Sequence, residues 1–159
     1  MTLSPRNSAC MDRKEVRIIN RSDISDFFTN RDKAWQNHNA EALTATHTPD
    51  GEIESPLFGN LKGQEAIQKS YLEWFSTFPD TEWHSEHLLI DGDRVAQFVI
   101  LTATQQRDIC GFPATGKRMQ IRGTSLCFLN EDKIIRETRM YDFTGVLVQL
   151  GLLKAKPSF

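Results

Sequence analysis

Hydrophobic positions change from a helical to an alternating spacing near residue 83, so the pattern divides the chain into two parts. In the first part, apolar side chains recur every three or four residues, as in amphipathic helices. One such stripe follows Ser22 and Asp23, residues suited to cap a helix, and a second covers Gln64–Phe78. The first stripe contains Ile24, Phe27, Phe28, Ala34, Trp35 and His38, and the second contains Ile67, Tyr71, Trp74, Phe75 and Phe78. A short helix near Ala40–Thr46 is predicted between them.

The second part alternates apolar and polar residues over segments of strand length. Strands are predicted over Trp83–Ile90, Arg94–Gln105, Arg118–Leu129 and Lys133–Tyr141. The first two are joined at Asp91-Gly92-Asp93, a strong signal for a tight hairpin turn. A last apolar helix is expected at about Phe143–Leu153.

Between the two long helices the signals are shorter. Thr48–Gly51 predicts a turn, Glu52–Pro56 a short strand closed by proline, and Leu57–Gly63 a loop. Helices therefore come first and an antiparallel meander follows, without βαβ alternation. This order predicts an α+β fold, in which helices pack on one face of a curved sheet. Such a sheet, closed by helices, forms a cone around a cavity, where ligand sites are common.

Length and composition narrow the class of protein. The 159 residues predict one domain over 22–153, with flexible tails at 1–21 and 154–159. With 39% hydrophobic residues and a net charge of −2, the chain reads as a soluble globular protein that does not bind nucleic acid. No apolar run is long enough to span a membrane, and the first residues lack the apolar segment of a secretory signal, so we expect a cytoplasmic protein.

The candidate chemistry lies on the last predicted strand. Residues two apart on a strand share a face, so Glu137, Arg139 and Tyr141 should be neighbours. One interpretation is a carboxylate and a guanidinium inside an apolar chamber. Glu137 would then act as general acid or base, Arg139 would orient it or bind a ligand oxygen, and Tyr141 would donate a hydrogen bond. The alternative is a structural ion pair or a solvated outer face.

Other residues offer weaker signals. His47 lies just before the first strand, where it could reach a cavity mouth or simply end a helix. Trp35 and Trp74 could form an aromatic ligand pocket, although residues at this spacing more often belong to the core. Glu52 and Glu54 fit a solvated face. Neither the histidines nor the three widely spaced cysteines have metal-binding spacing, so neither a metal nor another cofactor is predicted.

Several segments together resemble a known family. Their order is PDGEIESP, GQEAI, WFSTFPD, IDGDRVAQF, GFPATGK, DKIIRE and YDFTGVLVQLG, from about Asp23 to Gly151. They are similar to the SnoaL-like branch of the nuclear-transport-factor-like barrel proteins, which includes polyketide cyclases of secondary metabolism and ester-cyclase-like proteins. The resemblance implies a cone-shaped mixed barrel, a small hydrophobic ligand, no cofactor and a homodimer.

The same resemblance places the catalytic residues of these cyclases on this chain. Their acid/base Asp on the last strand falls at Arg139, and supporting histidines fall near Glu137 and Ser125. With this face inward, Ser125 would also line the cavity. The first hypothesis is therefore a cofactor-independent cyclase or isomerase that moves a proton on a small apolar carbonyl compound. The alternatives are a ligand-binding or dimerising module without catalysis, and water activation of the epoxide-hydrolase type.

Overall fold

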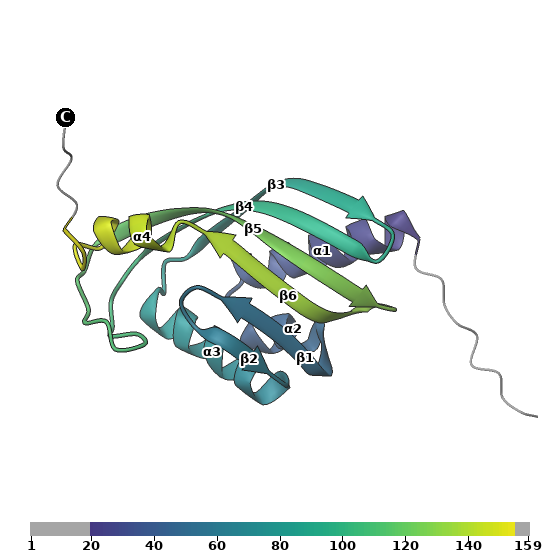
Figure 1. The fold of residues 1–159 in the computed structure, drawn as a ribbon, viewed down its shortest axis with the longest axis horizontal. Coiled ribbons are helices and arrows are strands. Elements are labelled where there is room, and N and C mark those ends of the chain that lie inside the picture. Colours follow the sequence, from purple (N-terminus) through teal and green to yellow (C-terminus); the bar gives the residue numbers. More distant parts are fainter. Residues whose placement is uncertain (1–19, 155–159) are drawn as a thin grey trace, which may run out of the picture.

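The structure is a computed structural model that describes residues 20–154, folded as helices on a single sheet (Figure 1). The predicted tails, and Cys10 within the first, lie outside the described residues apart from their innermost positions. Four helices are described: α1 (Arg21–Gln36), α2 (Ala40–Ala45), α3 (Gln64–Thr77) and α4 (Phe143–Gln149). The strands are β1 (His47–Ser55), β2 (Gly59–Lys62), β3 (Glu82–Asp91), β4 (Arg94–Thr104), β5 (Arg118–Asn130) and β6 (Lys133–Tyr141).

The six strands form one mixed sheet in the order β2-β1-β6-β5-β4-β3. All neighbouring pairs are antiparallel except β1 and β6, which run parallel because the chain passes through α3 and the β3–β5 meander before it returns beside β1. Helices α1, α2 and α3 cover one face of the curved sheet, and α4 lies at one end of it (Figure 1). The predicted α+β class and mixed sheet are confirmed.

The segment between α2 and α3 differs from the prediction. Thr48–Gly51 is not a turn but part of β1, and it coincides with a break in the register between His47 and Glu52 against β6. Leu57–Gly63 is not only a loop, because it contains β2, which pairs with β1 as a hairpin. Pro49 and Gly51 thus mark a bulged strand rather than a chain reversal, as such residues do at irregular points of sheet edges.

The ends of the first and last helices also differ. The N-cap of α1 is Asn20, not Ser22 or Asp23; its side chain accepts a bond from the Asp23 backbone N–H at 2.9 Å, and Asp23 completes a capping box. The final helix ends at Gln149 instead of Leu153, and Gly151, with a φ of +74°, follows it.

The main core lies between the helices and the concave face of the sheet. Trp35 of α1 and both Tyr71 and Trp74 of α3 are buried in it, whereas Ile24 and Phe28 of α1 belong to a second, smaller cluster. On β1, Ile53 and Ser55 are buried whereas Glu52 and Glu54 are exposed, as the alternation predicts. Val146 and Leu150 of the α4 segment join the same core. None of the helices within 20–154 is both long and apolar enough to cross a membrane.

We predict that Gly51→Ala destabilises the protein by about 1–3 kcal/mol, since an added methyl group would overpack the bulge of β1. A Cβ at this position would lie 3.1 Å from both the Thr48 carbonyl oxygen and the Cβ of His47, and 3.3 Å from the Ile134 carbonyl oxygen. The measurement is the free energy of unfolding in urea, with the exposed Glu54→Ala as control. Unchanged stability of Gly51→Ala would show that the bulge can widen freely.

Candidate functional site

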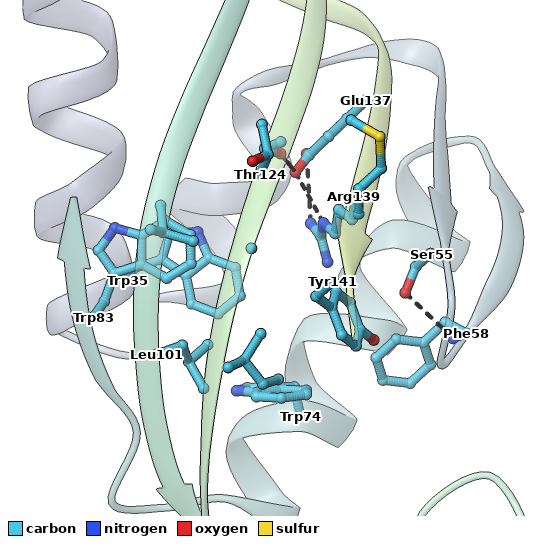
Figure 2. Close-up of a pocket in the computed structure, with 15 residues that line it drawn as sticks. Trp35, Ser55, Phe58, Trp74, Trp83, Leu101, Thr124, Glu137, Arg139 and Tyr141 are labelled. Atoms are coloured by element: carbon cyan, nitrogen blue, oxygen red, sulfur yellow. Dashed lines mark hydrogen bonds and ion pairs between the residues drawn. The ribbon is translucent and has the colours of Figure 1, made fainter. Parts of the chain in front are cut away.

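A cavity of about 70 Å³ lies between the helices and the concave face of the sheet (Figure 2). Most of its wall is apolar or aromatic, and its ionisable groups come from a single strand, β6. The apolar lining is Trp35, Phe58, Trp74, Trp83, Val99, Leu101, Ile121, Gly123 and Met140; the polar lining is Ser55, Thr124, Ser125, Glu137, Arg139 and Tyr141. The face of β6 that carries Glu137, Arg139 and Tyr141 therefore points inward, which excludes the solvated outer face.

Glu137 is the centre of a buried hydrogen-bond cluster. Its Oε2 accepts bonds from Arg31 Nη2 at 2.7 Å and from His47 Nε2 at 3.2 Å. Its Oε1 accepts bonds from Arg139 Nε at 2.8 Å and from the Ser125 hydroxyl. In addition, Arg139 Nη2 donates a longer bond to Oε2, at 3.4 Å. Both carboxylate oxygens are thus occupied by donors from four side chains.

Tyr71 ties α3 to this cluster. Its hydroxyl oxygen accepts a bond from Arg139 Nη2 at 2.8 Å and one from Arg31 Nη2 at 3.3 Å. The two guanidinium groups therefore share two acceptors, the Glu137 carboxylate and the Tyr71 hydroxyl. Burial raises the pKa of Tyr71, so the phenol stays neutral at physiological pH.

The environment keeps Glu137 ionised. Burial by itself would raise the pKa of this carboxyl, but the guanidinium groups of Arg139 and Arg31 outweigh it and hold the pKa well below its usual range. A carboxylate with a low pKa is a weak base, and each of its oxygens is already engaged. Glu137 can therefore accept a proton only from a substrate whose C–H group is already unusually acidic.

The three basic side chains of the cluster, Arg31, Arg139 and His47, differ in their protonation. Burial alone would lower the pKa of Arg31 and of Arg139, but the Glu137 carboxylate outweighs it, so both guanidinium groups remain protonated. Burial lowers the pKa of His47, the two guanidinium groups lower it further, and the bond to Glu137 does not compensate. His47 is consequently a neutral donor to Glu137 rather than a second cation.

Aromatic rings form the wall next to Arg139. The rings of Trp35 and Trp83 are stacked, with centroids 4.5 Å apart and planes within 3° of each other. Trp83 is fixed by its Nε1–H, which donates to Asp32 Oδ1 at 2.7 Å. The Arg139 guanidinium carbon lies 5.9 Å from the Trp35 ring and 5.3 Å from the Tyr71 ring. The guanidinium group thus lies within cation–π distance of these rings, and the cavity presents a cation next to aromatic faces.

Six of the seven residues that the sequence suggests for the site line the cavity, and the seventh, His47, contacts Glu137 from outside the lining. The six are Glu137, Arg139, Tyr141, Ser125, Trp35 and Trp74. His47 is not at the cavity mouth: its buried ring lies behind Glu137, because the bulge of β1 starts at His47 and turns it toward the interior. Trp35 and Trp74 belong both to the core and to the wall.

Arg31 is a charged member of the site that the sequence did not predict. Its side chain is 0% exposed and pairs with Glu137, which is 2% exposed. A signal was present, since Arg31 lies three residues after Phe28 and four before Trp35, within the apolar stripe of α1. A charged residue in such a stripe needs a buried partner, and the sequence does not show which one.

Other chemistries have little support within residues 20–154. No group of three or more His, Cys, Asp or Glu side chains there is placed to hold a metal ion. Cys127 is buried, and burial raises the pKa of its thiol to about 12, so it is a poor nucleophile. What the site offers is an ionised carboxylate beside a guanidinium, in a mostly apolar cavity.

We predict that Glu137→Gln destabilises the protein by about 3–5 kcal/mol, because two buried guanidinium groups would lose their shared counter-charge. The matched control is Glu52→Gln, whose solvent-exposed pair with Lys62 at 2.8 Å is screened by water, so this variant should have almost the stability of the wild type. Chemical denaturation of both variants measures the difference. Equal, small effects would mean that Glu137 does not hold the cluster together.

The same carboxyl predicts a pH dependence. The folded pKa of Glu137 lies below its ordinary value of 4.5, so its stabilising contribution is fully present above pH 4.5 and is lost as the pH falls through the folded pKa. The stability difference between wild type and Glu137→Gln should therefore be constant at neutral pH and shrink in acid. Denaturation curves at several pH values test this, and a difference that grows in acid would contradict it.

Comparison with known proteins agrees with this architecture. The family model described as SnoaL-like polyketide cyclase matches residues 26–150. No curated protein matches the sequence. Among solved structures, TsrD from Streptomyces laurentii is similar with a TM-score of 0.75 at 20% identity, covering 85% of this chain and 99% of its own.

Two further structures share the fold. A Catenulispora acidiphila DSM 44928 protein, described as having a ketosteroid isomerase-like fold, has a TM-score of 0.69 at 17% identity, over 79% of this chain and 92% of its own. TerC, co-crystallised with polyporic acid, has a TM-score of 0.66 at 15% identity, and the match covers 80% of this chain and 97% of TerC. Because the family model covers most of the sequence, the chain belongs to the SnoaL-like polyketide cyclase family.

Proposed function

We propose that this chain is a cofactor-independent cyclase or isomerase, which binds a small apolar carbonyl or polyketide-like compound in the cavity and moves a proton on it. The observation that carries this proposal is the pair formed by Glu137 and Arg139, 2.8 Å apart on one wall of a mostly apolar cavity. Glu137 is the one carboxylate among the cavity-lining residues. Apolar surroundings strengthen the electrostatic effect of both groups.

The proposed step divides the work between these two residues. The bond between hydrogen and the carbon next to a carbonyl breaks, the proton passes to Glu137, and the electron pair moves onto the carbonyl oxygen. Arg139 stabilises the enolate oxygen, as preorganised donors do at developing charges. In a cyclisation, the enolate carbon attacks a second carbonyl of the same molecule, and the oxygen of that carbonyl takes the proton from Glu137. In an isomerisation, another carbon conjugated with the enolate takes the proton from Glu137. Either route restores the Glu137 carboxylate.

The low pKa of Glu137 limits the substrates that can react. A weak base removes a proton only from a carbon that the bound cation has already made acidic. Arg139 meets this need because its side chain remains 16% exposed while the Glu137 side chain is 2% exposed. TerC, which shares this fold, was co-crystallised with polyporic acid, an organic acid. The stacked rings of Trp35 and Trp83 suit a flat organic ligand in the cavity of this chain.

A second candidate function is binding without catalysis. The observation that favours it is that both oxygens of Glu137 already accept hydrogen bonds from protein donors. In that case Arg139 would recognise a ligand oxygen, and Glu137 would only hold Arg139 in place. Water activation is less well supported, since the cavity lining has no second carboxylate to share that work.

The test uses methyl acetoacetate, whose methylene group between two carbonyls exchanges hydrogen for deuterium in D₂O. NMR measures the exchange rate with the protein, and the rate in buffer alone is subtracted. Arg139→Met should lower the protein-catalysed rate by about 100-fold or more, because the oxygen loses its cation. Glu137→Asp keeps the charge but withdraws the base, and should lower the rate by at least about ten-fold. Arg122, in an exposed pair with Glu86, is the control: Arg122→Met should keep the wild-type rate.

Each possible result has a separate meaning. If folded Arg139→Met and Glu137→Asp both retain the wild-type rate, the proposed catalytic pair is wrong. If the wild type binds methyl acetoacetate without accelerating exchange, the binding function replaces the enzymatic one. Thermal unfolding of each variant shows whether a lost rate reflects a lost fold.

A further inference from the structure

The buried cluster around Glu137 carries more positive than negative charge. Arg31 and Arg139 are both protonated, and Glu137 is the carboxylate that pairs with them. Tyr71 is a neutral partner for both guanidinium groups. His47 adds no acceptor, since its Nε2 faces the same Glu137 oxygen that Arg31 occupies. The cluster therefore has an excess of about one positive charge.

The rest of the described chain does not balance this charge by direct contact. Among residues 20–154, neither guanidinium group forms a salt bridge to an acidic side chain other than Glu137. Asp32 is the neighbour of Arg31 in sequence, but its Oδ1 accepts bonds from Trp83 Nε1 and Gln97 Nε2 instead. An uncompensated charge in an apolar environment is costly, so the cluster favours an additional anion.

The two guanidinium groups differ in what can reach them. Arg31 is completely enclosed, and its Nε and Nη1 have no partner within the described residues. Arg139 points from β6 into the space in front of Trp35 and Trp83, as Figure 2 shows. Its Nε and Nη2 are engaged by Glu137 and Tyr71, whereas Nη1 donates no hydrogen bond to any described residue. An incoming anion can therefore bind only at Arg139.

We propose that the cavity binds its ligand as an organic anion, whose negatively charged oxygen accepts a hydrogen bond from Arg139 Nη1. The oxygen belongs to a flat group, an ionised enol or a carboxylate, with its apolar body against Trp35 and Trp83. This inference rests on the proposed function in one respect: both place the ligand in the same cavity. It goes further in giving the ligand a charge before any proton is transferred.

The shape and donor count of the site select this class of anion. A phosphate group carries several oxygens that need several donors, whereas Arg139 offers one unengaged nitrogen at a mostly apolar wall. A planar oxyanion needs few donors, and its ring or chain gains from contact with the stacked tryptophans. The negative charge of the ligand also neutralises the excess positive charge of the cluster, which Glu137 alone does not balance.

The experiment compares matched charged and neutral probes by isothermal titration at pH 7.5 and constant salt. The first pair is benzoate and benzamide; the second is 1,3-cyclohexanedione, an acidic enol, and its neutral methyl enol ether. Wild type should bind the anion of at least one pair about ten-fold or more tighter than its neutral partner. The pair that shows the preference tells whether a carboxylate or an enol is recognised.

Variants assign the preference to Arg139. Arg139→Met leaves Arg31 and Glu137 as a balanced pair, so it should fold and should bind charged and neutral probes alike. Arg139→Lys keeps the charge and should keep part of the preference, and Arg122→Met should keep all of it. Equal binding of both probes by wild type, binding of neither pair, or a preference that survives Arg139→Met would overturn the proposal.

The outcome is independent of catalysis. An anion preference without exchange of methyl acetoacetate would support this inference and reject the enzymatic function. Exchange without an anion preference would leave the enzymatic function in place and reject the inference.

Discussion

The carboxylate of Glu137 joins the elements that form the cone. It receives bonds from Arg31 of α1, His47 at the start of β1, Ser125 of β5 and Arg139 of β6, and Tyr71 of α3 contacts both guanidinium groups. A buried ion pair is not in itself strong evidence for stability, but its geometry is demanding. A slip of one residue in β6 would turn Glu137 to the outside and leave Arg31 without a counter-charge. The register that pairs Ser125 with Arg139 is therefore tied to the charges of the interior as well as to apolar packing.

Much of this arrangement can be predicted from the sequence, because periodicity reports which face of an element is buried. The alternation along β6 places Glu137, Arg139 and Tyr141 together, and the helical spacing places Trp35 and Trp74 in the roof of the cavity. Periodicity does not show which buried charged side chains contact each other. Arg31 and Glu137 are 106 residues apart in the chain, and their contact depends on how α1 crosses the sheet. The bulge that turns His47 inward is likewise hidden, since Pro49 and Gly51 indicate a turn as readily as a bulge.

The resemblance to polyketide cyclases implies an acid/base Asp at the position of Arg139, so the carboxylate of this chain lies two residues earlier on the same strand. Two residues of a strand correspond to about 6.7 Å, which places the carboxylate in a different part of the cavity. The exchange also changes the balance between the two groups. An Asp at 139 would be a base at the cavity wall, whereas here a cation takes that place and the carboxylate is held behind it in a saturated set of hydrogen bonds. In the proposed reaction, charge stabilisation by Arg139 therefore contributes more than the basicity of Glu137.

Arg31 explains why Arg139 remains available to a ligand. If Arg139 were the one cation beside Glu137, the two would neutralise each other and the cavity would present a closed ion pair. Arg31 contacts Oε2 of Glu137 at 2.7 Å, whereas Arg139 Nε contacts Oε1, so Arg31 supplies a second positive charge to the carboxylate, while its complete burial keeps it from any ligand. Arg139 then keeps its charge, its position is fixed through Glu137 and Tyr71, and one nitrogen is left without a protein partner. In the proposed anion site, a residue that cannot contact the ligand thus determines how strongly its neighbour binds the ligand.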